Sequence, residues 1–178
     1  GYDFTFAGQY VQFGGLPAKA SGPGALGTGA LYFDHSGDSN SRQIYLRYLN
    51  VRFKGIMRGL DLAIGRMPYT SGGESSSGDA AIEAVKRQRI DSRLIGEFEW
   101  SIYQRGFDGA RVDLDRPKWH LTASALVPTQ GGFEESANAS LKRVLVLTGA
   151  LSLKPAAVFR RTDWQLFAYR YNDNRPVH

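Results

Sequence analysis

Apolar and polar residues alternate along much of the chain, which is the pattern of a strand with one apolar and one polar face. The clearest stretch is Gly96–Arg105, where Phe98, Trp100 and Ile102 would share one face. The opposite face would carry Glu97, Glu99, Ser101, Tyr103 and Arg105. We therefore expect a strand over Gly96–Arg105.

A hairpin is predicted directly after this segment. Ala110, Val112 and Leu114 alternate with charged residues, and Asp115–Lys118 provides a turn. The return strand, Trp119–Val127, alternates in the same way. Fainter alternation predicts strands near residues 3–10, 25–34, 42–53, 60–65, 145–153 and 164–171, which makes about nine strands in series.

The predicted connections differ in length. The turn at 115–118 is short, whereas segments 14–24, 34–41 and 68–92 are long. Within the last of these, Asp79 is a suitable N-cap for a short helix over Ala80–Arg89. Short turns alternating with long loops are typical of a membrane β-barrel with a periplasmic and an extracellular end.

Composition narrows the class of protein. Of 178 residues, 42% are hydrophobic and 22% are charged, which indicates an ordered chain. No window approaches the roughly 20 apolar residues of a membrane helix, but strands of a membrane barrel need only about 9–11 residues. The net charge of +5 favours acidic partners. Because the sequence contains no cysteine, disulfides and thiolate metal sites are excluded.

These patterns predict one all-β domain over residues 1–178, either an antiparallel transmembrane β-barrel or part of one. A soluble β-sandwich or lipocalin-like barrel that binds or hydrolyses acidic carbohydrate remains the alternative, because its strands alternate equally well. Periodicity does not separate the two.

Several motifs resemble the alginate-export family of outer-membrane barrels. The first is Leu60–Arg66, followed by Tyr69, Ser71, Gly72 and Glu74. Further similar stretches are Lys86–Ile90, Arg93–Gly96, Arg105–Gly109 and Pro128–Gly131, so the resemblance extends over roughly Arg42 to Phe133.

This resemblance implies a monomeric barrel of about 18 strands in the bacterial outer membrane. It also implies a lumen whose arginines and lysines pass a polyuronate or a similar anion. The chain supplies about half of those strands and ends in Arg175–His178 rather than in a closing aromatic residue. We therefore expect it to be the N-terminal portion of a longer barrel, in contact with outer-membrane lipid.

The candidate pore-lining residues are charged positions on the polar faces and in the long loop. They are Arg52, Arg66, Arg87, Arg89, Arg93, Glu97, Glu99, Arg105, Arg111 and Asp113. Arginines bind carboxylates in bidentate fashion, and we expect Arg52, Arg66, Arg105 and Arg111 to form one basic track. Glu97 and Glu99 would lie side by side on a strand and pair with arginines of neighbouring strands, rather than face each other across a catalytic cleft.

Other chemistry has little support in the sequence. His35, His120 and His178 are scattered without ligand spacing, so we expect no metal site and no nucleophile–base pair. No glycine loop has the context of a phosphate-binding motif, and nucleic-acid binding would rest on net charge alone. We therefore expect a channel rather than an enzyme, without a cofactor and without a nucleic-acid partner.

Overall fold

The computed structural model describes residues 1–18, 28–154 and 162–176. Its strands form one seven-stranded antiparallel sheet in which each strand pairs with the next along the chain. The strands are β1 (Tyr2–Gln12), β2 (Arg42–Met57), β3 (Leu60–Met67), β4 (Phe107–Asp115), β5 (Trp119–Pro128), β6 (Val144–Leu153) and β7 (Trp164–Asp173). The two helices are α1 (Thr28–Ser36) and α2 (Ala80–Arg89).

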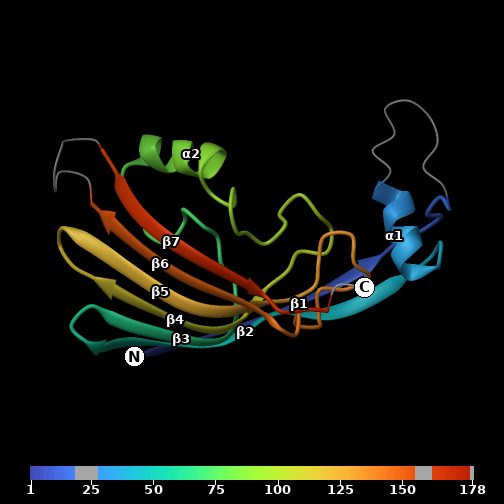
Figure 1. Ribbon diagram of the computed structural model, residues 1–178, viewed down its shortest axis with the longest axis horizontal. Helices are drawn as coiled ribbons and strands as arrows, with labels where there is room; N and C mark the ends of the chain where they lie inside the picture. Colours follow the sequence, from blue (N-terminus) through green and yellow to red (C-terminus); the bar gives the residue numbers. More distant parts are fainter. Residues whose placement is uncertain (19–27, 155–161, 177–178) are drawn as a thin grey trace.

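The sheet is curved like a trough, with α2 above its concave side (Figure 1). An all-β fold is thus confirmed, but the sheet is not closed into a barrel. Among the described residues, no strand pairs with the outer edge of β1 or of β7.

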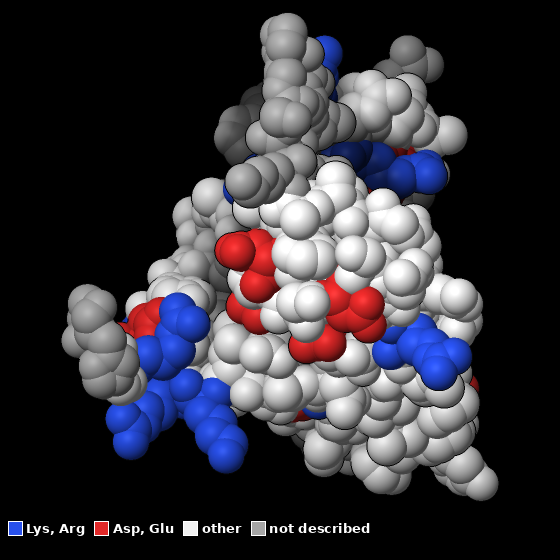
Figure 2. Space-filling model, turned by 90° about the vertical axis from the view of Figure 1, so that its right-hand side faces the viewer, with Lys and Arg blue, Asp and Glu red and all other residues white. Residues whose placement is uncertain are grey.

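The two ends of the sheet differ. Residues 58–59 and 116–118 connect strands at one end, whereas the long connections 13–41, 68–106 and 129–143 leave from the other. Phe13, Tyr32, Tyr45, Tyr103 and Phe133, which come from three of these connections and from β2, pack together at the long-loop end. Figure 2 views this end and shows Asp and Glu side chains near its middle, with Lys and Arg side chains toward its periphery.

Seven of the nine predicted strands are present, and so is the predicted short helix. Asp79 caps α2, because its carboxylate accepts hydrogen bonds from the backbone N–H groups of Ala81 and Ile82. The alternating pattern therefore identified the strands of the sheet correctly.

The two remaining strand predictions were wrong. The segment 25–34 was predicted as a strand, but residues 28–34 belong to α1, and residues 25–27 lie outside the described residues. The segment Gly96–Arg105 is a compact loop: Phe98 has a left-handed backbone with φ of 60°, and the Ser101 N–H donates to the Phe98 carbonyl. A left-handed residue at its centre prevents an extended strand there.

The two faces of the sheet differ in polarity. One row joins Val51, Ile64, Ala110, Ala125 and Leu147, and all five are apolar. On this convex face many large apolar side chains are exposed, among them Tyr2, Phe4, Phe6, Ile44, Leu49, Phe53, Ile64, Val112, Leu121, Leu145, Leu147 and Leu166. The concave face instead carries Asn50, Arg52, Asp61, Arg111, Asp113, His120, Thr122, Ser124, Thr148, Ser152, Gln165 and Tyr169.

Gly65 of β3 and Gly109 of β4 lie opposite each other in the register. An added Cβ at Gly65 would lie 2.3 Å from the Leu49 carbonyl oxygen, and one at Gly109 would lie 2.0 Å from that of Ala125. Only glycine therefore allows the backbones of β2 to β5 to approach so closely at this bend.

Candidate functional site

Asp113 is the centre of a polar network on the concave face. Its carboxylate is only 3% exposed and accepts hydrogen bonds from Arg52 Nη2 at 3.1 Å, Arg111 Nη2 at 2.8 Å and Thr122 Oγ1 at 2.7 Å. His120 Nε2 lies 3.3 Å from the same carboxylate. A buried carboxylate with this many partners holds the surrounding side chains in fixed positions.

The two arginines of this network, Arg52 and Arg111, are neutralised by ion pairs with aspartates. Arg52 also pairs with Asp61 at 3.1 Å, and Arg111 Nη2 additionally donates to the Glu74 carbonyl oxygen at 3.0 Å. Arg52, Arg111 and Asp113 thus share the concave face, as expected from the sequence. Their charges largely cancel, so these arginines contribute little net positive potential.

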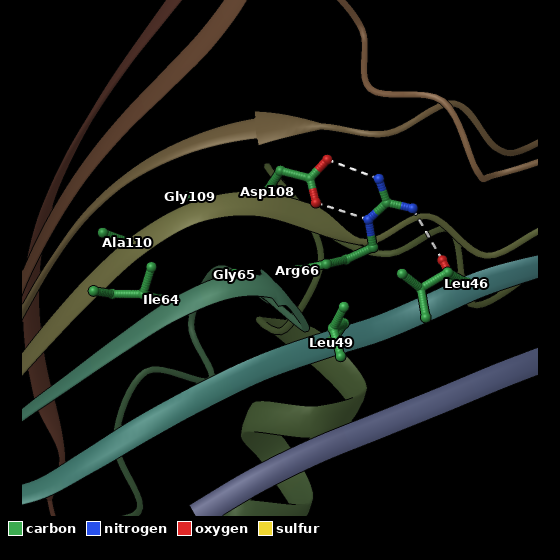
Figure 3. A pocket seen from close by; sticks show the side chains of 8 residues that line it. All are labelled: Leu46, Leu49, Ile64, Gly65, Arg66, Asp108, Gly109 and Ala110. Carbon is green, nitrogen blue, oxygen red and sulfur yellow. Dashed lines mark hydrogen bonds and ion pairs between the residues drawn. The ribbon is translucent and has the colours of Figure 1, made fainter.

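Arg66 does not belong to this network, and the prediction of one basic track through Arg52, Arg66, Arg105 and Arg111 was wrong. Arg66 forms a two-pronged ion pair with Asp108, at 2.7 and 2.8 Å, and donates to the Leu46 carbonyl (Figure 3). The pair lines an open groove of about 560 Å³ among convex-face residues such as Leu49 and Ile64. Its register position opposite Leu49 assigns Arg66 to the convex side.

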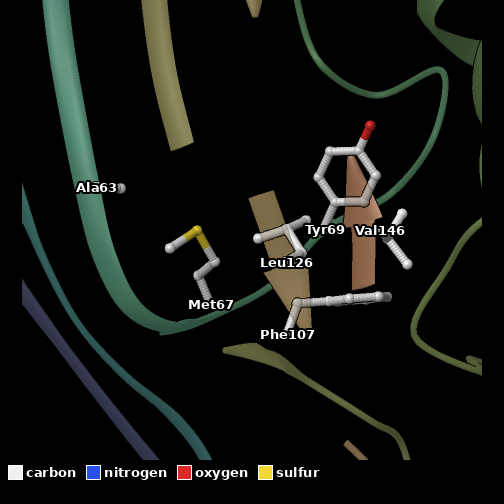
Figure 4. Close-up of a cluster of buried hydrophobic side chains, with 6 residues drawn as sticks. All are labelled: Ala63, Met67, Tyr69, Phe107, Leu126 and Val146. Atoms are coloured by element: carbon white, nitrogen blue, oxygen red, sulfur yellow. The ribbon is translucent and has the colours of Figure 1, made fainter. Parts of the chain in front are cut away.

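The long β3–β4 connection, residues 68–106, folds back over the concave face. Tyr69 of this segment packs with Ala63, Met67, Phe107, Leu126 and Val146 in a buried apolar cluster (Figure 4). The cluster covers the inner side of the sheet near the long-loop end, so the connection is packed against the sheet rather than projecting away from it.

Glu74 holds this connection in place. Its side chain, in a residue only 4% exposed, accepts hydrogen bonds from Tyr69 Oη at 2.9 Å, Tyr169 Oη at 2.8 Å and Gln165 Nε2 at 2.9 Å. Burial and the nearby carboxylate raise the pKa of Tyr69, so its hydroxyl stays protonated and remains a donor.

A second attachment involves α2. Lys86 is 6% exposed, donates from Nζ to the Ser75 carbonyl at 2.7 Å and pairs with Asp163 at 3.1 Å, just before β7. The connection is therefore attached to β4 through Arg111 and to β7 through Gln165, Tyr169 and the Lys86 ion pair.

Glu97 and Glu99 do not lie side by side on a strand, because Gly96–Arg105 is a loop. Glu97 is buried, accepts a hydrogen bond from the Tyr48 hydroxyl and lies 3.4 Å from Arg47 Nη2, so its partner is Arg47 and not Arg52, Arg105 or Arg111. Burial raises the pKa of Glu97 despite these two donors. Glu99 is exposed to solvent.

Four of the predicted arginines have no carboxylate partner within the described ranges: Arg87, Arg89, Arg93 and Arg105. The first three are exposed on α2 and the turn after it. Arg89 and Arg93 line a cavity of about 230 Å³ together with Gln165, Phe167 and Tyr169 of β7. The predicted arginines that form no ion pair thus lie on the β3–β4 connection, not on the strands of the sheet.

Glu74 and its β7 partners Gln165 and Tyr169 hold the β3–β4 connection against the sheet, but the sequence did not identify them as site residues. Glu74 entered only as part of a family-like motif, and nothing linked it to Gln165 or Tyr169. The available signal for a buried site residue was a glutamate in a Gly/Ser-rich stretch shortly after Tyr69.

The described part of the chain holds no cluster of three or more His, Cys, Asp or Glu side chains arranged to bind a metal ion. Within the same residues, no helix has the length and apolar character needed to cross a membrane.

Comparisons with known proteins give no neighbour for this chain. No family model matches it. No curated protein and no solved structure matches it either. The resemblance to the alginate-export family therefore stays a prediction.

Proposed function

We propose that this chain forms part of the wall of a bacterial outer-membrane channel that passes anionic solutes, with the β3–β4 connection narrowing the passage. The observation that carries the proposal is the contrast between the two faces of the sheet. The convex face carries exposed apolar side chains on each of the seven strands, with the paired Arg66 and Asp108 at its long-loop end, whereas the concave face is rich in hydrogen-bonded polar side chains.

Such a convex face needs an apolar environment. Monomeric soluble proteins rarely expose contiguous apolar patches larger than a few hundred Å². The exposed side chains here extend from Phe4 on β1 to Leu166 on β7, and within the described ranges no second sheet covers them. Lipid acyl chains would cover this face without a protein partner.

The strand lengths fit a bilayer. The ten residues of β5 span about 33 Å at about 3.3 Å per residue, and a tilt of about 40° reduces this height to about 25 Å. That value equals the height of the apolar band on outer-membrane barrels. In a longer barrel, further strands would also pair with the open edges of β1 and β7.

Anion preference would come from the β3–β4 connection. Arg52 and Arg111 of the wall are paired with Asp61 and Asp113, whereas Arg87, Arg89 and Arg93 have no carboxylate partner among the described residues. Arginines beside a narrow passage favour anions, because the low-dielectric walls focus their field. The polyuronate implied by the resemblance is one solute of this class.

The test is a planar-bilayer measurement on the full-length protein under a salt gradient at low ionic strength. We expect discrete conductance steps and a reversal potential that indicates anion preference. Replacing Arg87, Arg89 and Arg93 by Gln should lower this preference, whereas Arg58→Gln, a matched control at the short-turn end, should leave it unchanged.

Two results would count against the proposal. Absence of any conductance from folded protein would argue for the alternative, a soluble sheet whose convex face is covered by another protein layer. Conductance with cation preference would refute the role of Arg87, Arg89 and Arg93 in anion selectivity.

A further inference from the structure

The short turns at the end of the sheet opposite the long loops carry three cations. Arg58 lies in the β2–β3 turn, and Arg116 and Lys118 lie in the β4–β5 turn (Figure 1). The two turns are in contact, because Arg116 Nη1 donates to the Arg58 carbonyl at 2.5 Å. Within the described ranges, no carboxylate pairs with any of the three cations. These turns therefore carry positive charge that no ion pair neutralises.

The carboxylates at the same end lie on the concave side and have partners there. Asp61 pairs with Arg52 at 3.1 Å. Asp115 pairs with Lys154 at 2.8 Å and lies 3.0 Å from His120 Nδ1. An anion that approaches the turns from the convex side therefore meets the three cations rather than these carboxylates.

Along the convex face, the side chains change in a regular order toward these turns. One cross-strand row consists of Leu121, Leu151 and Leu166. The next row toward the turns consists of Trp119, Leu153 and Trp164. Arg116 and Lys118 follow at the turn itself. Leucines, then tryptophans, then cations match the acyl chains, the interface and the phosphate groups of one bilayer leaflet, in that order.

Arg116 is positioned beside Trp119 at this level. Its guanidinium carbon lies 6.0 Å from the centre of the Trp119 ring, and its backbone N–H donates to the Trp119 carbonyl at 2.9 Å, which closes the turn. An open cavity of about 430 Å³ is lined by Arg116, Pro117, Lys118 and Trp119. The cavity thus combines two cations with an aromatic ring of the convex face.

Two donors of Arg116 are accessible for a ligand. Its side-chain hydrogen bonds, to the carbonyls of Arg58 and Asp115, both use Nη1. Nε and Nη2 have no acceptor within the described residues, and neither belongs to the buried atoms that lack a partner, so both reach solvent. Adjacent guanidinium N–H groups of this kind bind two oxygens of a phosphate together.

From this arrangement we infer that the two turns bind the headgroup of an anionic phospholipid, such as phosphatidylglycerol, in the periplasmic leaflet. The inference rests on the lipid-facing convex face of the proposed function. The phosphate accepts hydrogen bonds from Nε and Nη2 of Arg116, and Lys118 lines the same cavity. The acyl chains extend from Trp119 along the leucine row.

Charge selects phosphatidylglycerol over phosphatidylethanolamine. Both lipids have a phosphodiester, but the second also has an ammonium group that the cations of the turns repel. One basic residue near a membrane surface contributes about 1 kcal/mol toward an anionic lipid, which is about fivefold in a binding constant. We therefore expect at least about a fivefold preference for phosphatidylglycerol.

The test is native mass spectrometry of the full-length protein in a neutral detergent at low ionic strength. The protein is titrated with phosphatidylglycerol, with phosphatidylethanolamine of the same acyl chains, and with glycerol phosphate. The binding constant for the first phosphatidylglycerol should exceed that for phosphatidylethanolamine at least about fivefold. Glycerol phosphate should bind more weakly than phosphatidylglycerol, because it has no acyl chains to contact the leucines.

Variants of the β4–β5 turn make the assignment specific. The Lys118 side chain forms no hydrogen bond or ion pair within the described ranges, so Lys118→Gln changes the charge without removing a contact of the turn. It should lower the preference about two- to fivefold, and the double variant Arg116→Gln/Lys118→Gln should abolish it. Lys118→Arg should retain the preference. Lys142→Gln, an exposed lysine at the long-loop end, is the matched control and should behave as wild type.

Three results would overturn the inference: equal binding of both phospholipids by wild type, an unchanged preference in the double variant, or binding of glycerol phosphate as tight as that of phosphatidylglycerol. Planar-bilayer conductance of the same preparation separates this inference from the channel. A conducting protein without lipid preference refutes the headgroup site alone. A protein that shows the preference but does not conduct supports the headgroup site and refutes the channel.

Discussion

The attachment of the β3–β4 connection through Glu74 can be tested with an isosteric substitution. In Glu74→Gln one side-chain oxygen can still accept from Tyr69 and Tyr169, but the new amide group meets the Gln165 amide as a second donor. Two hydrogen bonds lose their charged acceptor at about 1 kcal/mol each, and the third is lost at about 1 kcal/mol. The expected destabilisation of the closed loop is thus about 3 kcal/mol.

Limited trypsin digestion measures this change, because exposed Arg87, Arg89 and Arg93 lie in the segment that Glu74 holds. If cleavage requires local opening, about 3 kcal/mol corresponds to a cleavage rate roughly 100-fold higher. Glu99→Gln is the matched control, since it removes an exposed carboxylate of the same connection, and its cleavage rate should equal that of wild type.

Equal cleavage of wild type, Glu74→Gln and Glu99→Gln would refute the role of Glu74. The exposed arginines would then be accessible without any opening, and the loop would be held by other contacts. Faster cleavage of both variants would show a general effect of lost negative charge rather than a specific attachment.

Three further predictions concern the charged groups. Asp113→Asn should increase anion preference in planar bilayers, because it removes the negative charge that pairs with Arg52 and Arg111. Arg66→Gln should leave ion selectivity unchanged, because Arg66 lies on the convex side. A change in selectivity from Arg66→Gln would contradict that placement. Burial raises the pKa of Glu97 above its ordinary value of 4.5, so the folded protein holds this proton more tightly than the unfolded chain does. The resulting stability is complete below about pH 4.5 and is lost as the pH rises through the raised pKa. In urea unfolding, the stability of wild type relative to Glu97→Gln should therefore decrease over this window, and parallel pH curves would contradict the assignment.

The sheet could be predicted from the sequence because its two faces have different surroundings. Along β5 the apolar positions Leu121, Ala123 and Ala125 face outward and Thr122 and Ser124 face inward, so the contrast is present in the order of residues itself. The helix α2 was predicted for a similar local reason, since the Asp79 cap and the segment it begins are adjacent in sequence.

The failure at Gly96–Arg105 has a physical explanation. Trp100 packs against Phe133 of another loop rather than on a sheet, with ring centres 5.2 Å apart, and Phe98 packs against Trp100. Periodicity describes a single segment and contains no information on whether a neighbouring strand is present.

The site was less predictable than the fold because its contacts join distant segments. Glu74 is 91 residues from Gln165 and 95 from Tyr169. The opposite placement of Arg66 and Arg111, by contrast, follows from the alternation itself, because Arg66 continues the apolar series of Leu60, Leu62 and Ile64 whereas Arg111 alternates with Ala110 and Val112.

The central claim is that the convex face contacts lipid and the concave face contacts water, and cysteine scanning tests it directly. The chain contains no cysteine, so single cysteines can be placed at successive positions of β2 from Leu49 to Lys54 without a background. In the full-length protein reconstituted into vesicles, a charged maleimide should label positions 52 and 54, whose side chains are partly exposed on the concave side, whereas a bilayer-confined spin label should quench fluorophores at 49, 51 and 53. Two results would contradict the account: labelling of both sets by the charged reagent, or lack of quenching at the odd-numbered positions.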